Sequence, residues 1–169
     1  MHLLNKITAE DVKKLKILFF DFDGVFTDNF VYISQTGEEQ IKCSRLDGIG
    51  LSKIKKLGLI PMIISTEKNK VVTKRADKLG VICHQSVHDK ASKINDICCE
   101  YGVCPKDQLF LGNDENDIAA LDFVGIPVAV KDYHPSIAEH AKYVTQAQGG
   151  KGAVREVCDL VNSLILQGK

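Results

Sequence analysis

Three aspartates follow a short apolar run near the start of the chain. Residues 17–20 are uniformly apolar, and Asp21, Asp23 and Asp28 come directly after them. A short run rich in Ile, Leu and Phe is typical of a strand buried on both faces of a parallel sheet. Asp21 and Asp23 are two residues apart, so an extended backbone directs both carboxylates to one side. Gly24 then allows the chain to turn close to a ligand.

Two carboxylates held this close repel each other unless a cation lies between them or one of them takes up a proton. With a hard cation such as Mg2+, one aspartate can act as ligand and nucleophile while the other moves a proton. The alternative interpretation is an acidic turn after a strand, because Asp and Gly favour turns for conformational reasons alone. Evidence from other parts of the sequence is needed to choose between these two interpretations.

Polar residues of suitable types follow the other predicted strands. Ser65 ends the second apolar run, Lys90 begins the helix after the third, and Asn113, Asp114 and Asp117 follow the fourth. Each alone could be a cap, a turn or a solvated lysine. Together they supply a nucleophilic carboxylate, a hydroxyl donor, a cation and oxygen ligands, which are the groups that phosphoryl transfer needs.

Strands and helices alternate along the chain, which predicts an α/β fold. We expect a Rossmann-like three-layer sandwich with a central parallel sheet of about five strands, a β-hairpin flap at about 29–45 and no cap domain. Residues 1–169 are expected to form a single domain. The expected strands are 17–20, 59–64, 81–83, 108–111 and 126–130, and the main expected helices are 1–15, 47–57, 69–79, 89–101 and 153–166.

Composition argues against several classes of partner. Lys plus Arg and Asp plus Glu each total 22, so the formal charge is zero and neither a nucleic acid nor a membrane is expected as a partner. No apolar segment reaches the roughly 20 residues that span a bilayer, and no signal peptide is evident. A cytoplasmic location is therefore expected. The six cysteines lack the usual zinc-ligand spacing and are interpreted as reduced packing residues.

These motifs, in this order, resemble the haloacid dehalogenase superfamily of Mg2+-dependent phosphatases. The resemblance implies that Asp21 attacks phosphorus to form an aspartyl-phosphate and that Asp23 serves as general acid and then general base. Ser65 and Lys90 would hold phosphoryl oxygens. Mg2+ would be bound by Asp21, the carbonyl of Asp23, Asn113 and Asp114, with Asp117 orienting the metal's surroundings.

The segments 23–28, 47–50, 75–80 and 149–156 are similar to those of the capless phosphatases of 3-deoxy-2-keto sugar acids. That family includes 3-deoxy-D-manno-octulosonate 8-phosphate phosphatases, of lipopolysaccharide biosynthesis, and N-acylneuraminate 9-phosphate phosphatases, of sialic acid biosynthesis. It implies a phosphorylated sugar acid as substrate. It also implies a homotetramer whose hairpins meet centrally and whose subunits help to close one another's active sites, which would shield the phosphoenzyme from water.

Two departures from the family pattern keep alternatives open. Asn113 stands where many relatives have Asp, and Glu67 resembles the nonulosonate variant rather than the octulosonate one. Glu67, with Arg75 and Lys78 one turn apart on a helix, is the expected substrate-binding set, although the basic pair could equally be a solvated face. Eight-carbon and nine-carbon substrates both remain possible, and Glu67 favours the nine-carbon ester. A noncatalytic tetramerisation domain of a sugar-acid cytidylyltransferase is one alternative, and a phospho-acceptor signalling domain is another.

Overall fold

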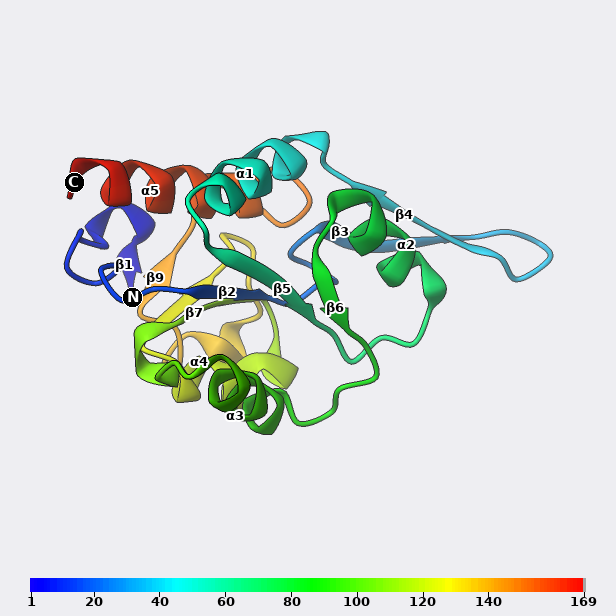
Figure 1. Ribbon diagram of the computed structural model, residues 1–169. Helices are drawn as coiled ribbons and strands as arrows, with labels where there is room; N and C mark the ends of the chain where they lie inside the picture. Colours follow the sequence, from blue (N-terminus) through cyan, green and yellow to red (C-terminus); the bar gives the residue numbers. More distant parts are fainter. Residues whose placement is uncertain (169) are drawn as a thin grey trace.

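The computed structural model describes residues 1–168, whose centre is a seven-stranded parallel sheet (Figure 1). The strands lie in the order β1-β9-β8-β7-β2-β5-β6. Their bounds are β1 His2–Leu3, β2 Ile17–Phe20, β5 Ile60–Ile64, β6 Ile82–His84, β7 Leu109–Gly112, β8 Ile126–Ala129 and β9 Tyr143–Val144. The predicted fold class is confirmed. The sheet is wider than the predicted five strands because the two-residue strands β1 and β9 extend one edge.

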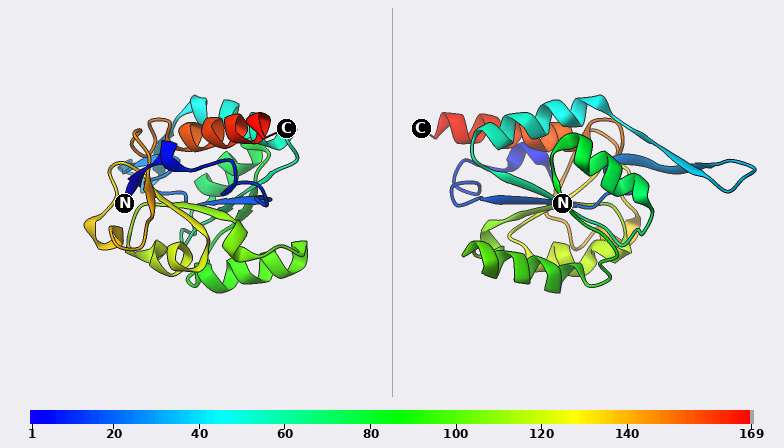
Figure 2. Two further views of the ribbon diagram at one scale, coloured as in Figure 1. Left: turned by 90° about the vertical axis from the view of Figure 1, so that its left-hand side faces the viewer. Right: turned by 45° about the vertical axis from the view of Figure 1, so that its right-hand side comes forward.

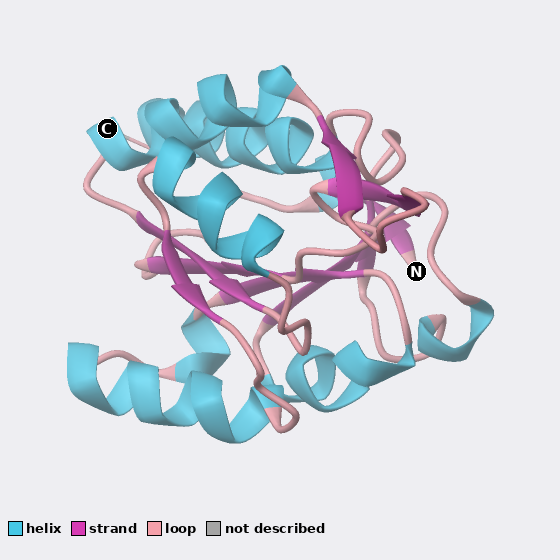
Figure 3. Cartoon of the chain, turned by 90° about the vertical axis from the view of Figure 1, so that its right-hand side faces the viewer, coloured by secondary structure: helices cyan, strands magenta, loops and turns pink. Residues whose placement is uncertain are grey.

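Helices cover both faces of the sheet (Figures 1 and 3). On one face lie α1 (Arg45–Lys56), α2 (Lys70–Leu79) and α5 (Ala153–Gln167), and on the other lie α3 (Lys90–Tyr101) and α4 (Ile118–Phe123). The side chains of β2 alternate between these layers. Leu18 and Phe20 join the core under α1 and α5, while Ile17 and Phe19 join the core above α3 and α4, and all four are fully buried.

Local capping sets the helix ends that matter for the site. Ser44, Asn69 and Asp89 accept hydrogen bonds from the first turns of α1, α2 and α3, respectively, as N-cap side chains do. Gly80 and Gly102 end α2 and α3 in left-handed conformations. The Asp89 cap fixes the first residue of α3, which carries one of the predicted functional side chains.

An antiparallel hairpin, β3 (Thr27–Ile33) and β4 (Glu39–Cys43), extends away from the sheet (Figure 2). It follows the acidic turn and leads into α1, so the predicted flap is confirmed. Four consecutive apolar residues of β3 are exposed. Phe30, Val31, Tyr32 and Ile33 are between 52% and 70% accessible.

The N-terminal helix predicted over residues 1–15 is wrong. Thr8 and Asp11 do pair as at a helix N-terminus: the Thr8 hydroxyl accepts from the Asp11 amide at 3.3 Å, and the Thr8 amide donates to the Asp11 carboxylate at 2.8 Å. The chain then makes only turns to residue 14, and His2–Leu3 pairs with β9 instead. Sheet pairing and burial of Leu4 and Val12 therefore outweigh a helical pattern too short to be stable alone. No helix within residues 1–168 is long and apolar enough to cross a membrane, and the cellular location stays a prediction.

Candidate active site

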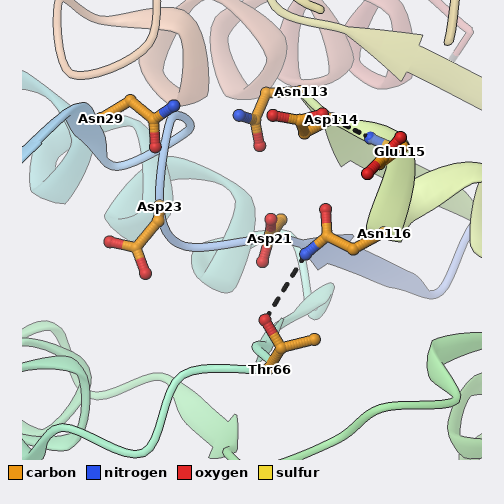
Figure 4. Close-up of a pocket in the computed structure, with 8 residues that line it drawn as sticks. All are labelled: Asp21, Asp23, Asn29, Thr66, Asn113, Asp114, Glu115 and Asn116. Atoms are coloured by element: carbon orange, nitrogen blue, oxygen red, sulfur yellow. Dashed lines mark hydrogen bonds between the residues drawn. The ribbon is translucent and has the colours of Figure 1, made fainter. Parts of the chain in front are cut away.

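The carboxyl ends of three neighbouring strands bring the predicted polar residues together. Strand β2 lies between β5 and β7, and the Asp21 amide that follows it donates to the Leu111 carbonyl at 2.9 Å. Ser65 follows β5 and Asn113 follows β7. A cavity of about 290 Å³ opens at this edge (Figure 4). It is lined by Asp21, Asp23, Asn29, Thr66, Asn113, Asp114, Glu115 and Asn116.

Lys90 lies between two carboxylates, one of which belongs to Asp21 in the cavity wall, and we refer to Lys90, Asp21 and Asp117 as the buried ion cluster. Its Nζ is 2.8 Å from Oδ1 of Asp21 and 2.6 Å from Oδ1 of Asp117. Lys90 is 1% exposed, Asp21 3% and Asp117 0%. The Phe110 ring lies 5.9 Å from the same ammonium. A lysine is rarely buried to this degree unless it is paired, and here it has two acidic partners.

Burial and mutual charge shift the pKa values of this group. Burial and the Asp117 carboxylate raise the pKa of Asp21 to about 7, although Lys90 opposes the shift. Burial alone would lower the pKa of Lys90, but Asp21 and Asp117 together raise it. Burial and the nearby Glu67 also raise the pKa of Asp23. Lys90 therefore stays charged, and Asp23 is better suited than an ordinary aspartate to carry a proton.

Asp117 connects Lys90 to the loop after β7. Its Oδ2 accepts hydrogen bonds from the amides of Asn113 at 2.8 Å and Asp114 at 3.3 Å, while its Oδ1 contacts Lys90. The side chain of Asp114 caps the short helix that follows by accepting from the Glu115 amide at 2.7 Å. One buried carboxylate thus holds both the cation and the backbone that presents Asn113 and Asp114.

The donor atoms at the cavity suit a hard cation. Oδ1 of Asn113 is buried and has no hydrogen-bond partner, and Figure 4 shows it directed towards Asp21. Gly24, at φ +75°, lies so close to the Asn113 amide that any side chain there would overlap it. Among residues 1–168 no three His, Cys, Asp or Glu side chains are grouped as metal ligands. The candidate set includes carboxylate, amide and carbonyl oxygens, all of which Mg2+ accepts.

Two other predicted residues, Ser65 and Glu67, lie in the turn after β5 and are not among the residues that line the cavity. Ser65 is buried, and its Oγ accepts a hydrogen bond from the Glu67 amide at 3.1 Å, so its hydroxyl caps the turn after β5. Glu67 caps the next turn by accepting from the amides of Lys68 and Asn69. With Asp23, Glu67 also lines a smaller pocket between this turn and the hairpin.

Arg75 and Lys78 do not line the Asp21 cavity of their own chain. They border a separate cavity of about 430 Å³ with Arg45. Arg75 donates to the Ser44 carbonyl at 2.7 Å. The structure therefore does not bring these two predicted substrate-binding residues to the predicted catalytic aspartates of the same chain.

Four residues of the cavity wall are absent from the sequence prediction: Asn29, Thr66, Glu115 and Asn116. Asn116 donates to the Thr66 hydroxyl at 3.4 Å, which links the loops after β7 and β5 (Figure 4). Thr66, Glu115 and Asn116 adjoin predicted residues, so the strand ends were a usable signal. Asn29 has a positive φ of 63°, which its amino-acid type tolerates but does not reveal.

Comparison with known proteins identifies relatives along almost the whole chain. A family profile described as haloacid dehalogenase-like hydrolase matches residues 60–157. The 3-deoxy-D-manno-octulosonate 8-phosphate phosphatase KdsC of Salmonella typhi is 35% identical over 99% of this chain and 86% of its own length.

Solved structures give the same result. That of 3-deoxy-D-manno-octulosonate 8-phosphate phosphatase from Moraxella catarrhalis, in complex with magnesium, phosphate and KDO, has a TM-score of 0.88. It is 28% identical, and the match covers 92% of this chain and 90% of the other. The corresponding Yersinia pestis structure has a TM-score of 0.89 at 31% identity, covering 95% and 87% of the two chains.

Proposed function

Because this chain belongs to the haloacid dehalogenase-like hydrolase family, we propose that it is a Mg2+-dependent phosphatase of 3-deoxy-D-manno-octulosonate 8-phosphate. The observation that carries the proposal is the buried Lys90, which contacts both Asp117 and Asp21, the latter a residue of the cavity wall. The names of the relatives support the eight-carbon substrate. The position of Glu67 beside Asp23 favours a nine-carbon N-acylneuraminate 9-phosphate as the second candidate.

The two aspartates divide the chemistry. A carboxylate oxygen of Asp21 attacks phosphorus, and the bond from phosphorus to the ester oxygen of the sugar breaks. Asp23 donates a proton to that oxygen as it leaves with the electron pair. Asp23 then accepts a proton from water, whose oxygen attacks phosphorus and displaces Asp21. The products are the sugar acid and inorganic phosphate, and both aspartates return to their starting state.

Positive charge and hydrogen-bond donors stabilise the phosphoryl group. Lys90 already touches Asp21, so a phosphoryl group transferred to Asp21 would lie within reach of its ammonium. The hydroxyl hydrogen of Ser65 is available because Oγ only accepts its hydrogen bond from Glu67. Mg2+ would be held by Asp21, the carbonyl of Asp23, Asn113 and Asp114, and would supply charge neutralisation for the phosphoryl oxygens.

A homotetramer would complete the substrate site. The exposed apolar residues of β3 suit an interface between subunits, since patches of this kind mark interaction surfaces. Arg75 and Lys78 border a cavity apart from Asp21, which supports a role at the site of a neighbouring subunit. There their charges would bind the sugar-acid carboxylate, while Glu67 would accept hydrogen bonds from substrate hydroxyl or N-acyl groups.

Phosphate release in the presence of Mg2+ tests the proposal. The eight-carbon 8-phosphate and the nine-carbon 9-phosphate are assayed side by side, with Asp21→Asn protein in parallel. We expect the eight-carbon ester to be preferred and Asp21→Asn to be inactive. Preference for the nine-carbon ester would establish the second candidate. Release from neither ester would overturn the enzymatic proposal and favour a noncatalytic assembly domain.

A further inference from the structure

The glycine-rich segment before α5 contacts the turn that carries the catalytic aspartates. We refer to residues 146–152 as the glycine loop and to residues 21–28 as the aspartate turn. The Gly150 amide donates to the Val25 carbonyl at 3.0 Å. A Cβ at Gly149 would lie 2.6 Å from the Gly24 carbonyl carbon and would overlap its oxygen. The two backbones therefore touch with no room for a side chain.

Gly24 is enclosed from two directions. One side faces Gly149, and the other faces the Asn113 amide, where a Cβ at Gly24 would lie 2.6 Å from Cγ. Its own amide donates to the Thr27 hydroxyl at 3.0 Å within the turn. Gly150 extends the contact along the turn, since a Cβ there would lie 2.5 Å from the Asp28 amide nitrogen. The glycine loop and Asn113 thus fix the backbone next to Asp23 between them.

Two carboxylates hold the glycine loop in place. Oδ1 of Asp132 accepts from the Gly149 amide at 2.9 Å. Glu156, in the first turn of α5, accepts from the Gln146 amide at 3.0 Å and the Ala147 amide at 2.8 Å. Hydrogen bonds of this charge-assisted kind are among the stronger ones in proteins. The loop is therefore a supported wall rather than a free connection.

We propose that the glycine loop positions the aspartate turn for catalysis, with Gly149 and Asp132 as positioning residues that touch neither substrate nor metal. The inference rests on the proposed phosphatase function. It accounts for a segment that lines none of the cavities described above but shares backbone contacts with the turn between Asp23 and the hairpin. A displacement of the turn by about 1 Å misaligns the reacting groups and can lower turnover by about 100-fold.

Gly149→Ala tests this, and Gly125→Ala is its matched control. A Cβ at Gly125 would also lie 2.6 Å from a carbonyl carbon, that of Lys106, and overlap the oxygen. Gly125 precedes β8, at the amino end of the strands and so on the edge of the sheet away from the cavity. Both variants should lose stability. We expect kcat of folded Gly149→Ala to fall about 100-fold with little change in KM and with a weakened Mg2+ dependence. Folded Gly125→Ala should keep the wild-type values, and equal losses in the two variants would overturn the proposal.

Asp132 provides a second comparison, which can test the positioning role even if Gly149→Ala does not fold. Asp132→Ala removes the acceptor for the Gly149 amide, whereas Asp132→Asn keeps an Oδ1 in the same place. We expect kcat to fall about tenfold in the first and to be largely restored in the second. Wild-type turnover in Asp132→Ala would overturn the positioning role.

Amide chemical shifts separate failure of this inference from failure of the proposed function. If wild-type protein hydrolyses no phosphomonoester, the function fails, but the contact is still testable. Shifts of the Gly24 and Thr27 amides should change in Gly149→Ala and stay constant in Gly125→Ala. Unchanged shifts in both variants would overturn the inference whatever the activity.

Discussion

The buried ion cluster and the hairpin depart from the usual distribution of residues in opposite ways. In the cluster, the charged Lys90 is 1% exposed, while on the hairpin Phe30 is 70% and Ile33 67% exposed. Charged groups are seldom buried and large apolar groups seldom gather on a surface without a reason. Lys90 finds its partners within the chain, in Asp21 and Asp117. The hairpin has only two strands, and its apolar side chains stay exposed in the chain, so in the proposed homotetramer a second subunit would cover them.

If the proposed homotetramer forms, this contrast separates the work of one subunit from the contribution of its neighbours. The proposed bond-making groups are held by one sheet and by buried hydrogen bonds. The proposed recognition groups, Arg75 and Lys78, lie apart from them. Under the proposed function, the chemistry would take place within one subunit, and selection of the sugar acid would depend on a neighbouring subunit.

Replacing Lys90 should give the largest effect. Lys90→Met removes the cation between two buried carboxylates, so kcat/KM should fall about 10³-fold. The free energy of unfolding should fall by about 3–5 kcal/mol, because Asp21 and Asp117 remain buried without their partner. Phosphate release and urea unfolding measure the two effects.

Lys93→Met is the control, since Lys93 lies in the same helix but is not a partner of Asp21 or Asp117. It should behave as wild type. Near-normal turnover in Lys90→Met would show that the buried lysine is structural, which would remove the catalytic half of the comparison.

Replacing the apolar hairpin residues should affect assembly first. The double variant Phe30→Ser and Ile33→Ser should sediment as a smaller species than wild type. Its kcat/KM should fall about 10- to 100-fold through loss of charged contacts from a neighbour, with the fold intact. Leu166→Ser, which removes an exposed apolar side chain elsewhere, should change neither. Unchanged sedimentation in the double variant would contradict the assembly role of the hairpin.

The sequence predicted the grouping of the strand-end residues better than it predicted the contacts of the hairpin, and the reason is physical. Strand ends in a parallel sheet meet at one edge, so the apolar run before Asp21 and the positions of Ser65 and Asn113 were sufficient to place them together. The same logic could not show that Lys90 pairs with both Asp21 and Asp117, because this depends on how α3 packs. The contacts proposed between subunits would leave even less trace in one sequence.

Two segments show where local patterns fail. In residues 1–15, Thr8 and Asp11 pair as at a helix N-terminus, yet no α-helix follows. Residues 9–14 form turns, and His2–Leu3 pairs with β9. The glycines at 149 and 150 indicate a turn in the sequence. Gly149 contacts Gly24, more than 100 positions earlier, and this contact depends on tertiary packing and on the hydrogen bonds from the loop to Asp132 and Glu156.

Asp47 gives the smallest effect on turnover and tests burial alone. Like Lys90 it is fully buried, but its Oδ2 has no hydrogen-bond partner within the described residues. Oδ1 accepts only a long bond from the Arg155 amide at 3.3 Å. Burial raises the pKa of Asp47 from 3.8 to about 6, against the opposing charges of Arg155 and Arg75.

The direction of the pH effect follows from this shift. Between about pH 4 and pH 6 the folded state binds more protons at Asp47 than the unfolded state does, so stability falls as pH rises through this window. At 1.36 kcal/mol per pKa unit, ionised Asp47 lowers the free energy of unfolding by about 3 kcal/mol above pH 7. Asp47→Asn removes the charge and keeps an acceptor for Arg155. Its stability relative to wild type should therefore increase from pH 4 to pH 7 and then stay level, with turnover unchanged.

Urea unfolding of both proteins across that range makes the measurement, and the difference between them cancels the other carboxylates. Lower stability of Asp47→Asn at pH 8 would mean that the ionised carboxylate has a stabilising partner after all. The expected gain would show that an unpaired buried charge opposes folding. Lys90→Met should lower stability for the same reason, because it leaves Asp21 and Asp117 buried without their cation. Three charged groups can then lie together in the buried ion cluster because Lys90 pairs with both Asp21 and Asp117.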